Sequence, residues 1–166
     1  ISAEEGEELL VQIEEAYGVD RDQISADDPN GGFLRNMVEM IPNDDGREFY
    51  AVNLEQLKEG EEAEAADQRY ARTVMPLIFA RGGYPVFVGR TAGQMLGDYG
   101  REVDRVAVVR YRSLRDMIDM VLDAEMQAGS PDKFASLDHT EVMIVRPSIS
   151  FAQMRLVVGA LLLLIG

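Results

Sequence analysis

The chain contains no cysteine and only one histidine among its 166 residues. Without cysteine it can form neither a disulfide nor a thiolate metal site, and it has no cysteine nucleophile. A single imidazole argues against a dedicated transition-metal site, because such sites usually gather several His, Asp or Glu ligands. The glycines show neither the G-x-G-x-x-G nor the G-x-x-x-x-G-K spacing of phosphate-binding loops. We therefore expect no metal and no cofactor.

Positive charge is scarce in the first part of the chain. Residues 1–70 hold 20 acidic and 5 basic side chains, whereas residues 71–166 hold 10 and 11, and the net charge is −14. An acidic surface repels phosphates, so nucleic acid is not expected as a partner. Hydrophobic residues make up 46% of the chain and charged residues 28%, which is the balance of a globular domain with a real core.

The acidic region is expected to be helical. Ser2 and Glu5 have the spacing of a capping box, apolar residues follow at helical intervals, and Gly18 suits a helix end, which together predict a helix over residues 3–17. Turn-forming residues fill 19–32, and 33–41 predicts a short amphipathic helix that Pro42 ends. We interpret residues 1–45 as an acidic helical extension before the main domain.

From residue 47 the pattern changes to alternating strands and helices. Strands are predicted at 47–54, 84–89, 102–111 and 140–147, with a helix over 59–83 and a glycine-rich loop at 91–100. A second helix begins after Ser113; Gly129-Ser130-Pro131 is predicted to break it, and 132–138 forms a last helical turn. The order β-α-β-β-α-β over residues 46–147 predicts an α+β, ferredoxin-like domain: an antiparallel four-stranded sheet with two helices on one face. The other face needs a cover, for which a second copy of the sheet is the usual solution.

Four segments carry a family resemblance: "FYAVNLEQLKEG", "YARTVMPLIFARGGYPVFVGR", "DRVAVVRYRSLRDMIDMV" and "HTEVMIVRP". Together they resemble the DUF1330 family of the dimeric α+β barrel superfamily, over roughly residues 47–147. The resemblance implies a homodimer whose two sheets pack face to face. It implies no reaction, because the wider superfamily includes monooxygenases, isomerases, haem proteins and ligand-sensing domains, and fold alone does not choose among them.

Five polar side chains are candidates for a ligand pocket: Asn53, Tyr70, Arg90, Arg110 and His139. An amide in an apolar strand needs a partner, a tyrosine can orient a ligand, and arginine fits carboxylates bidentately. Strand alternation puts Arg110 on one face with Val106 and Val108, and favours it over Arg105 as the buried charge. Each residue also has a structural alternative. Asn53 and His139 could make local hydrogen bonds, Tyr70 could be a core residue with a hydrogen-bonded hydroxyl, and the arginines could form ion pairs where two copies of the chain meet.

The chain ends in "LVVGALLLLIG", eleven residues without a polar side chain. A spanning helix needs about 20 apolar residues, so the segment is either a short buried helix or the first part of a membrane helix that continues beyond Gly166. The lack of any polar stripe favours a membrane helix starting within 148–166. Its anchor residues would be Leu156, Val157, Val158, Leu161, Leu162, Leu163, Leu164 and Ile165. Arg146 and Arg155 flank it on one side, which would place the domain in the cytoplasm.

Two functional hypotheses arise from the sequence. In the first, the chain is a membrane-anchored, non-catalytic domain that associates with itself as a homodimer or serves as an accessory subunit of a membrane protein complex, with lipid around its anchor. In the second, it is a small-molecule enzyme or sensor, monooxygenase- or isomerase-like, with a pocket in the barrel. The second hypothesis requires an enclosed cavity into which at least two of the five candidate side chains point.

Overall fold

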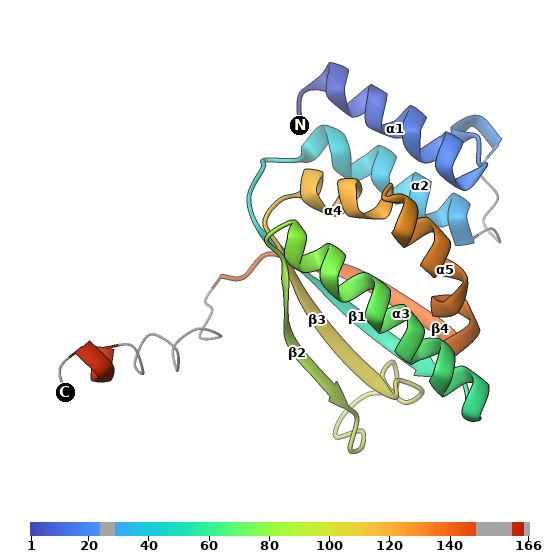
Figure 1. Ribbon diagram of the computed structural model, residues 1–166, viewed down its shortest axis with the longest axis vertical. Coiled ribbons are helices and arrows are strands. Elements are labelled where there is room, and N and C mark those ends of the chain that lie inside the picture. The colour runs from blue at the N-terminus through green and yellow to red at the C-terminus, as the bar shows by residue number, and fades with distance from the viewer. Residues whose placement is uncertain (24–28, 149–160, 165–166) are drawn as a thin grey trace.

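The computed structural model describes residues 1–23, 29–148 and 161–164. Figure 1 shows a sheet with helices along one of its sides. The helices are α1 (Ala3–Tyr17), α2 (Pro29–Met40), α3 (Glu61–Ala80), α4 (Leu114–Val121) and α5 (Ala124–Ser136), with short 3-10 turns at Arg21–Gln23 and Ile41–Asn43. The strands are β1 (Phe49–Leu57), β2 (Tyr84–Arg90), β3 (Arg105–Tyr111) and β4 (Leu137–Val145).

All strand pairs are antiparallel, and the strand order is β2-β3-β1-β4. From β1 to β4 the chain alternates as the sequence predicts, so the α+β, ferredoxin-like class is confirmed. The predicted ends of the strands differ from the observed ones by up to three residues, and those of β2 by at most one. Hydrophobic alternation marks the centre of a strand better than its limits.

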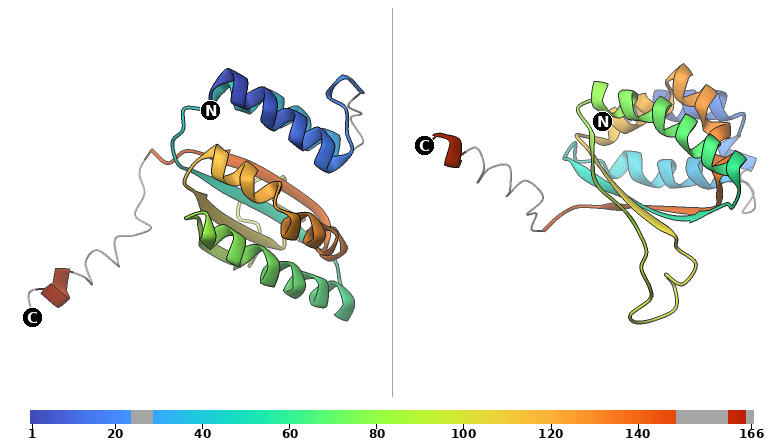
Figure 2. Two further views of the ribbon diagram at one scale, coloured as in Figure 1. Left: turned by 45° about the horizontal axis from the view of Figure 1, so that its top comes forward. Right: turned by 60° about the horizontal axis from the view of Figure 1, so that its bottom comes forward.

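The two faces of the sheet differ in what covers them. On β1, Phe49, Ala51 and Glu55 are buried beneath the helices, so the alternating residues Tyr50, Val52, Leu54 and Gln56 lie on the opposite face. Figure 2 shows α3, α4 and α5 on the same side of the sheet. We call the other side the open face, because no element of the described ranges 1–23, 29–148 and 161–164 packs over it.

The N-terminal helices contribute to the same core as the sheet domain. Ser2 and Glu5 form the predicted capping box, and Gly18 ends α1 in the left-handed conformation at a φ of 64°. Buried apolar residues of α1 and α2 share one cluster with residues of β1 and α4: Leu9, Leu10, Ile13, Leu34, Met37, Phe49, Leu114 and Ile118. A Glu5–Arg115 ion pair joins α1 to α4. The division of the chain near residue 46 stays a prediction, but the extension packs against the sheet domain.

The predicted helix break at Gly129-Ser130-Pro131 is wrong. The chain breaks earlier, where Leu122 ends α4 and the Asp123 side chain caps α5, and α5 continues through Pro131. The reason is packing against α3: a Cβ on Gly129 would lie 2.9 Å from Thr73 Cγ2, so the glycine permits a close approach of the two helices. In the same segment, Ser130 Oγ donates to the Met126 carbonyl at 2.9 Å.

The predicted membrane-anchored localisation is contradicted. Within residues 1–23, 29–148 and 161–164, no helix has the length and apolar character needed to cross a membrane. Leu161 to Leu164 form one helical turn with exposed side chains. The other predicted anchor residues, Leu156, Val157, Val158 and Ile165, lie outside the described residues.

Candidate functional site

A charged cluster joins the ends of β1 and β3 to α3. Glu55 and Arg105 face each other in the strand register, and Arg105 Nε donates to Glu55 Oε2 at 2.5 Å. The two Arg105 Nη groups donate to the two carboxylate oxygens of Asp67, at 2.8 and 2.7 Å. Glu55 is only 6% exposed. Hydrogen bonds to Asp67, reinforced by Glu55, raise the pKa of Arg105 further above its usual range. One cation thus neutralises two carboxylates from two elements.

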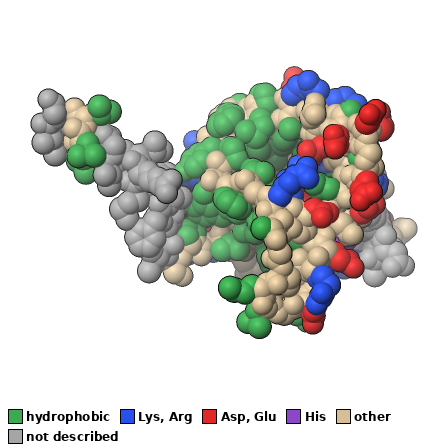
Figure 3. All heavy atoms as spheres, turned by 90° about the horizontal axis from the view of Figure 1, so that it is seen from below, with side chains coloured by type: hydrophobic (Ala, Val, Ile, Leu, Met, Phe, Trp, Pro, Cys, Tyr) green, Lys and Arg blue, Asp and Glu red, His purple; other side chains and the backbone are tan. Residues whose placement is uncertain are grey.

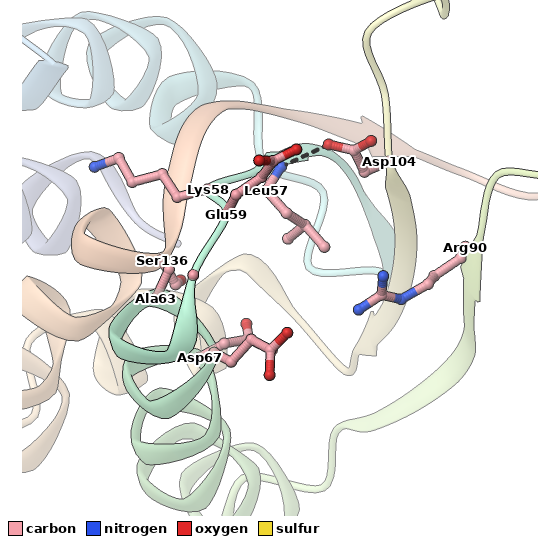
Figure 4. Close-up of a pocket in the computed structure, with 10 residues that line it drawn as sticks. Leu57, Lys58, Glu59, Ala63, Asp67, Arg90, Asp104 and Ser136 are labelled. Atoms are coloured by element: carbon pink, nitrogen blue, oxygen red, sulfur yellow. Dashed lines mark hydrogen bonds between the residues drawn. The ribbon is translucent and has the colours of Figure 1, made fainter.

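Beside this cluster lies a hollow of about 290 Å³, shown in Figure 4. Arg90 and Asp67 point toward it from opposite sides, and Asp104 accepts a hydrogen bond from the Leu57 amide at 2.8 Å. Ser136, which also lines it, is 2% exposed and donates to the Lys133 carbonyl at 2.9 Å. No imidazole lies among the described lining residues, and the hydroxyl of Ser136 is directed to a backbone carbonyl. The charged cluster beside the hollow ties β1 and β3 to α3.

Tyr70 and Lys133 meet between α3 and α5. Lys133 Nζ lies 5.9 Å from the centre of the Tyr70 ring, within the range of a cation–π contact. Burial raises the pKa of Tyr70 far above its usual value, and burial also lowers the pKa of Lys133. Tyr111 nearby is stacked on Phe49, and burial raises its pKa to about 12. Both phenols therefore stay protonated at neutral pH and cannot act as bases.

The other candidate pocket residues lie apart from one another. Asn53, on the helix side of β1, donates to the Ala107 carbonyl at 3.1 Å, which satisfies its amide within the sheet. Arg110 is on the open face, where it donates to Glu48 Oε2 at 2.8 and 2.5 Å and to the Gly82 carbonyl at 3.0 Å. His139, also on the open face, is exposed and lies 3.5 Å from Glu141. Of the five, Arg90 alone lines the hollow beside the charged cluster.

Arg110 is not more buried than Arg105, contrary to the preference drawn from the sequence. The two side chains are equally exposed, at 19%. Their partners differ, because Glu48 is 46% exposed whereas Glu55 is buried. Sequence reasoning missed Glu55 and Asp67, although the alternation of β1 places Glu55 on the face of Phe49 and Ala51 and could have identified it.

The open face of the sheet carries a band of apolar side chains. Every strand contributes one apolar residue to its central row, in the order Phe87, Val108, Val52, Met143. The two adjoining rows add Tyr84, Tyr50, Val145, Val106 and Leu54. Polar groups stand at the ends of the strands: Arg110 at one end, and Gln56, His139 and Glu141 at the other.

The apolar surface continues around the β2 edge. Figure 3 views the molecule from below Figure 1 and shows hydrophobic side chains gathered on one part of the surface and charged ones on another. Phe79 of α3 and Phe87 and Val88 of β2 are each more than half exposed. Apolar surface of this extent on a small domain usually marks an interaction site.

The loop between β2 and β3 projects from the body as an arm, residues 91–104 (Figures 1 and 2). Met95 is 100% exposed, Leu96 89% and Tyr99 108%. The sequence predicts a loop over 91–100 with a strand from 102, and the structure extends the loop to residue 104. The sequence analysis gives no role to its apolar residues. Large apolar residues within a glycine-rich turn segment are the signal that could have singled them out.

Comparisons with known proteins show the fold and no family. No family model matches the chain, and no curated protein matches it. The chain is similar in structure to RPA0582, a protein of unknown function from Rhodopseudomonas palustris: 20% identity, TM-score 0.64, covering 70% of this chain and 94% of that one. At this identity the likeness concerns the fold alone.

Two further solved structures match at lower similarity. SnoaB, a cofactor-independent oxygenase from Streptomyces nogalater, is 14% identical with a TM-score of 0.44, over 63% of this chain and 97% of that one. A dimeric protein of unknown function and ferredoxin-like fold from Bacteroides fragilis is 11% identical with a TM-score of 0.42, over 60% of this chain and 96% of that one. Neither value supports an inference about function.

Proposed function

We propose that the chain is a self-associating domain that forms a homodimer through the open faces of two sheets. The observation that carries the proposal is the central row of the open face. All four strands place an apolar side chain there, and no described element covers it: Phe87, Val108, Val52 and Met143. The resemblance of residues 47–147 to the DUF1330 family supports the same arrangement.

Physical chemistry favours a second sheet as the cover. Two sheets packed face to face lie about 10 Å apart with their inner side chains interdigitated. An apolar centre with polar groups at the strand ends suits this geometry, because the centre loses water while Arg110, His139 and Glu141 remain near the rim. Covering the open face would also prevent the non-specific association that an exposed apolar sheet favours.

The alternative of a small-molecule enzyme or sensor lacks a specific observation in its favour. It requires two of the five candidate side chains in one cavity, and in the described ranges Arg90 alone lines the hollow beside the charged cluster. Asn53 and Arg110 are engaged in hydrogen bonds within the chain. We therefore assign the charged cluster to stability and the open face to function.

The test of self-association is the mass of the native protein in solution. Sedimentation equilibrium over a hundredfold dilution should give twice the 18.5 kDa chain mass at micromolar concentration, with dissociation only on dilution. The mass of a single chain at every concentration up to 100 µM would overturn the proposal.

A further inference from the structure

We propose that the four leucines at positions 161–164 pack into a hollow of their own chain, at the corner of the domain where β4 ends. The inference begins from their exposure, since each of these side chains is more than half exposed in the helical turn that they form. Adjacent exposed leucines gain free energy by leaving water for another apolar surface. The proposed homodimer is a separate matter, because it uses the opposite side of the sheet.

The hollow has a volume of about 560 Å³ and four apolar side chains among its lining residues. Phe49 and Leu114 are buried in the core, whereas Met40 and Ile144 are only partly buried. Ile144 pairs with the buried Ala51 in the strand register, so the hollow lies on the helix-covered side of the sheet. An apolar occupant would remove the remaining water from Met40 and Ile144, which favours its binding.

The polar groups of the hollow are largely engaged within the chain. Asn43 donates to the Glu39 carbonyl at 2.8 Å. Asp44 accepts a hydrogen bond from the N-terminal ammonium group at 3.2 Å, and Arg146 forms an ion pair with Asp45 at 2.7 Å. The Glu39 side chain stands exposed at the rim. An occupant therefore need not bring charge, and a run of leucines brings none.

The chain leaves β4 at the rim of the hollow. Arg146 directly follows β4, lines the hollow and is held there by Asp45. In Figure 1 the end of α2, the start of α4 and the end of β4 lie on the same side of the molecule. The connector to the leucines, residues 147–160, is fourteen residues long, and a chain of that length spans up to about 45 Å. The leucines can therefore reach the hollow without any movement of the sheet or the helices.

The connector also favours the hollow of the same chain over that of a second copy. A segment tethered by a short connector is presented to a nearby site at an effective concentration in the millimolar range. At micromolar protein, the leucines of another chain compete at a concentration lower by about a thousandfold. The intramolecular contact should therefore form first.

The first test uses the fact that the chain contains no tryptophan. Leu163→Trp introduces the only indole, whose fluorescence emission moves to shorter wavelength when the ring leaves water. The folded variant should emit at clearly shorter wavelength than the same variant unfolded in guanidinium chloride. Adding Met40→Lys puts an ammonium group into the hollow at the C-terminal end of α2, where a cation suits the helix dipole. This second substitution should abolish most of the shift.

The matched control for Met40→Lys is Val38→Lys, at an exposed valine of the same helix, and it should leave the shift unchanged. Thermal unfolding followed by circular dichroism verifies that each variant folds. If the folded Leu163→Trp chain emits at the same wavelength as the unfolded one, the leucines stay in water and the proposal is wrong. A shift that persists in the presence of Met40→Lys overturns the hollow as their binding site.

The second test leaves the apolar lining of the hollow unchanged. The cysteine-free chain receives Glu39→Cys at the rim together with Leu163→Cys, and is treated with a short bis-maleimide at micromolar concentration. The control combines Leu163→Cys with Met95→Cys in the arm, at the opposite end of the sheet. Mass spectrometry and denaturing electrophoresis separate links within one chain from links between two.

The pair at the rim should give at least about fivefold more of the link within one chain than the control pair. Equal yields from the two pairs would overturn the proposal. A product of mainly twice the chain mass would assign the leucines to the hollow of a second copy and overturn the intramolecular contact. Each of these results leaves the open-face dimer to be judged by its own measurements.

Discussion

Replacing Val108 with glutamate is expected to convert the dimer into a monomer. Val108 lies in the central row of the open face, directly between Val52 and Phe87 in the strand register. A carboxylate there would be buried between two apolar sheets without a partner, at a cost of several kcal/mol. The dissociation constant should therefore rise by about 1,000-fold or more, which sedimentation equilibrium measures directly.

The matched control is Val11→Glu, the same substitution at an exposed valine of α1. Both variants should keep the circular dichroism spectrum of the native chain, since position 11 is exposed and position 108 lies on the face of the sheet that no described element covers. If Val108→Glu dimerises as tightly as Val11→Glu, the open face is not the interface.

Replacing Arg105 with alanine is expected to destabilise the domain by about 3–5 kcal/mol, because the buried Glu55 would lose the arginine that forms an ion pair with it. Glu55 would be left as a carboxylate with little access to water, and Asp67 would lose a bidentate partner. Chemical denaturation measures the difference. Arg47→Ala, which removes an exposed arginine paired with Asp45, is the control and should change stability little.

The loss should be recoverable by removing the buried carboxylate as well. The double variant Arg105→Met with Glu55→Leu replaces the ion pair by apolar side chains and should regain most of the stability that Arg105→Ala loses. A double variant as unstable as Arg105→Ala would show that Glu55 is not the buried charge responsible.

The sequence predicts the architecture because its signals are local and agree with one another. The alternation in β1 and β3 identifies both faces of the sheet, and the capping box of Ser2 and Glu5 marks the start of α1. The continuation of the helix through Gly129 could not be predicted in the same way. Glycine and proline disfavour a helix locally, but there the glycine serves the contact with Thr73 on another helix.

The partners of the candidate pocket residues could not be predicted from the sequence for a related reason. Residue type suggested that Asn53, Tyr70 and Arg110 could bind a ligand, but only three-dimensional register shows that the first bonds to Ala107 and the last to Glu48. Partners 54 and 62 positions away in the sequence leave no local pattern. The membrane prediction rested on the composition of the apolar tail alone, and within residues 1–23, 29–148 and 161–164 no helix is long and apolar enough to cross a membrane.

The most direct test of the open-face dimer is a distance between two copies of one residue. The chain has no cysteine, so Gln56→Cys places a single spin label at the end of the open face on β1, and Gln12→Cys places one on α1 as a control. With sheets about 10 Å apart, pulsed dipolar spectroscopy should give an intermolecular distance below about 30 Å for residue 56, and a longer one for residue 12. No dipolar coupling at residue 56, or a shorter distance at residue 12, would contradict the account.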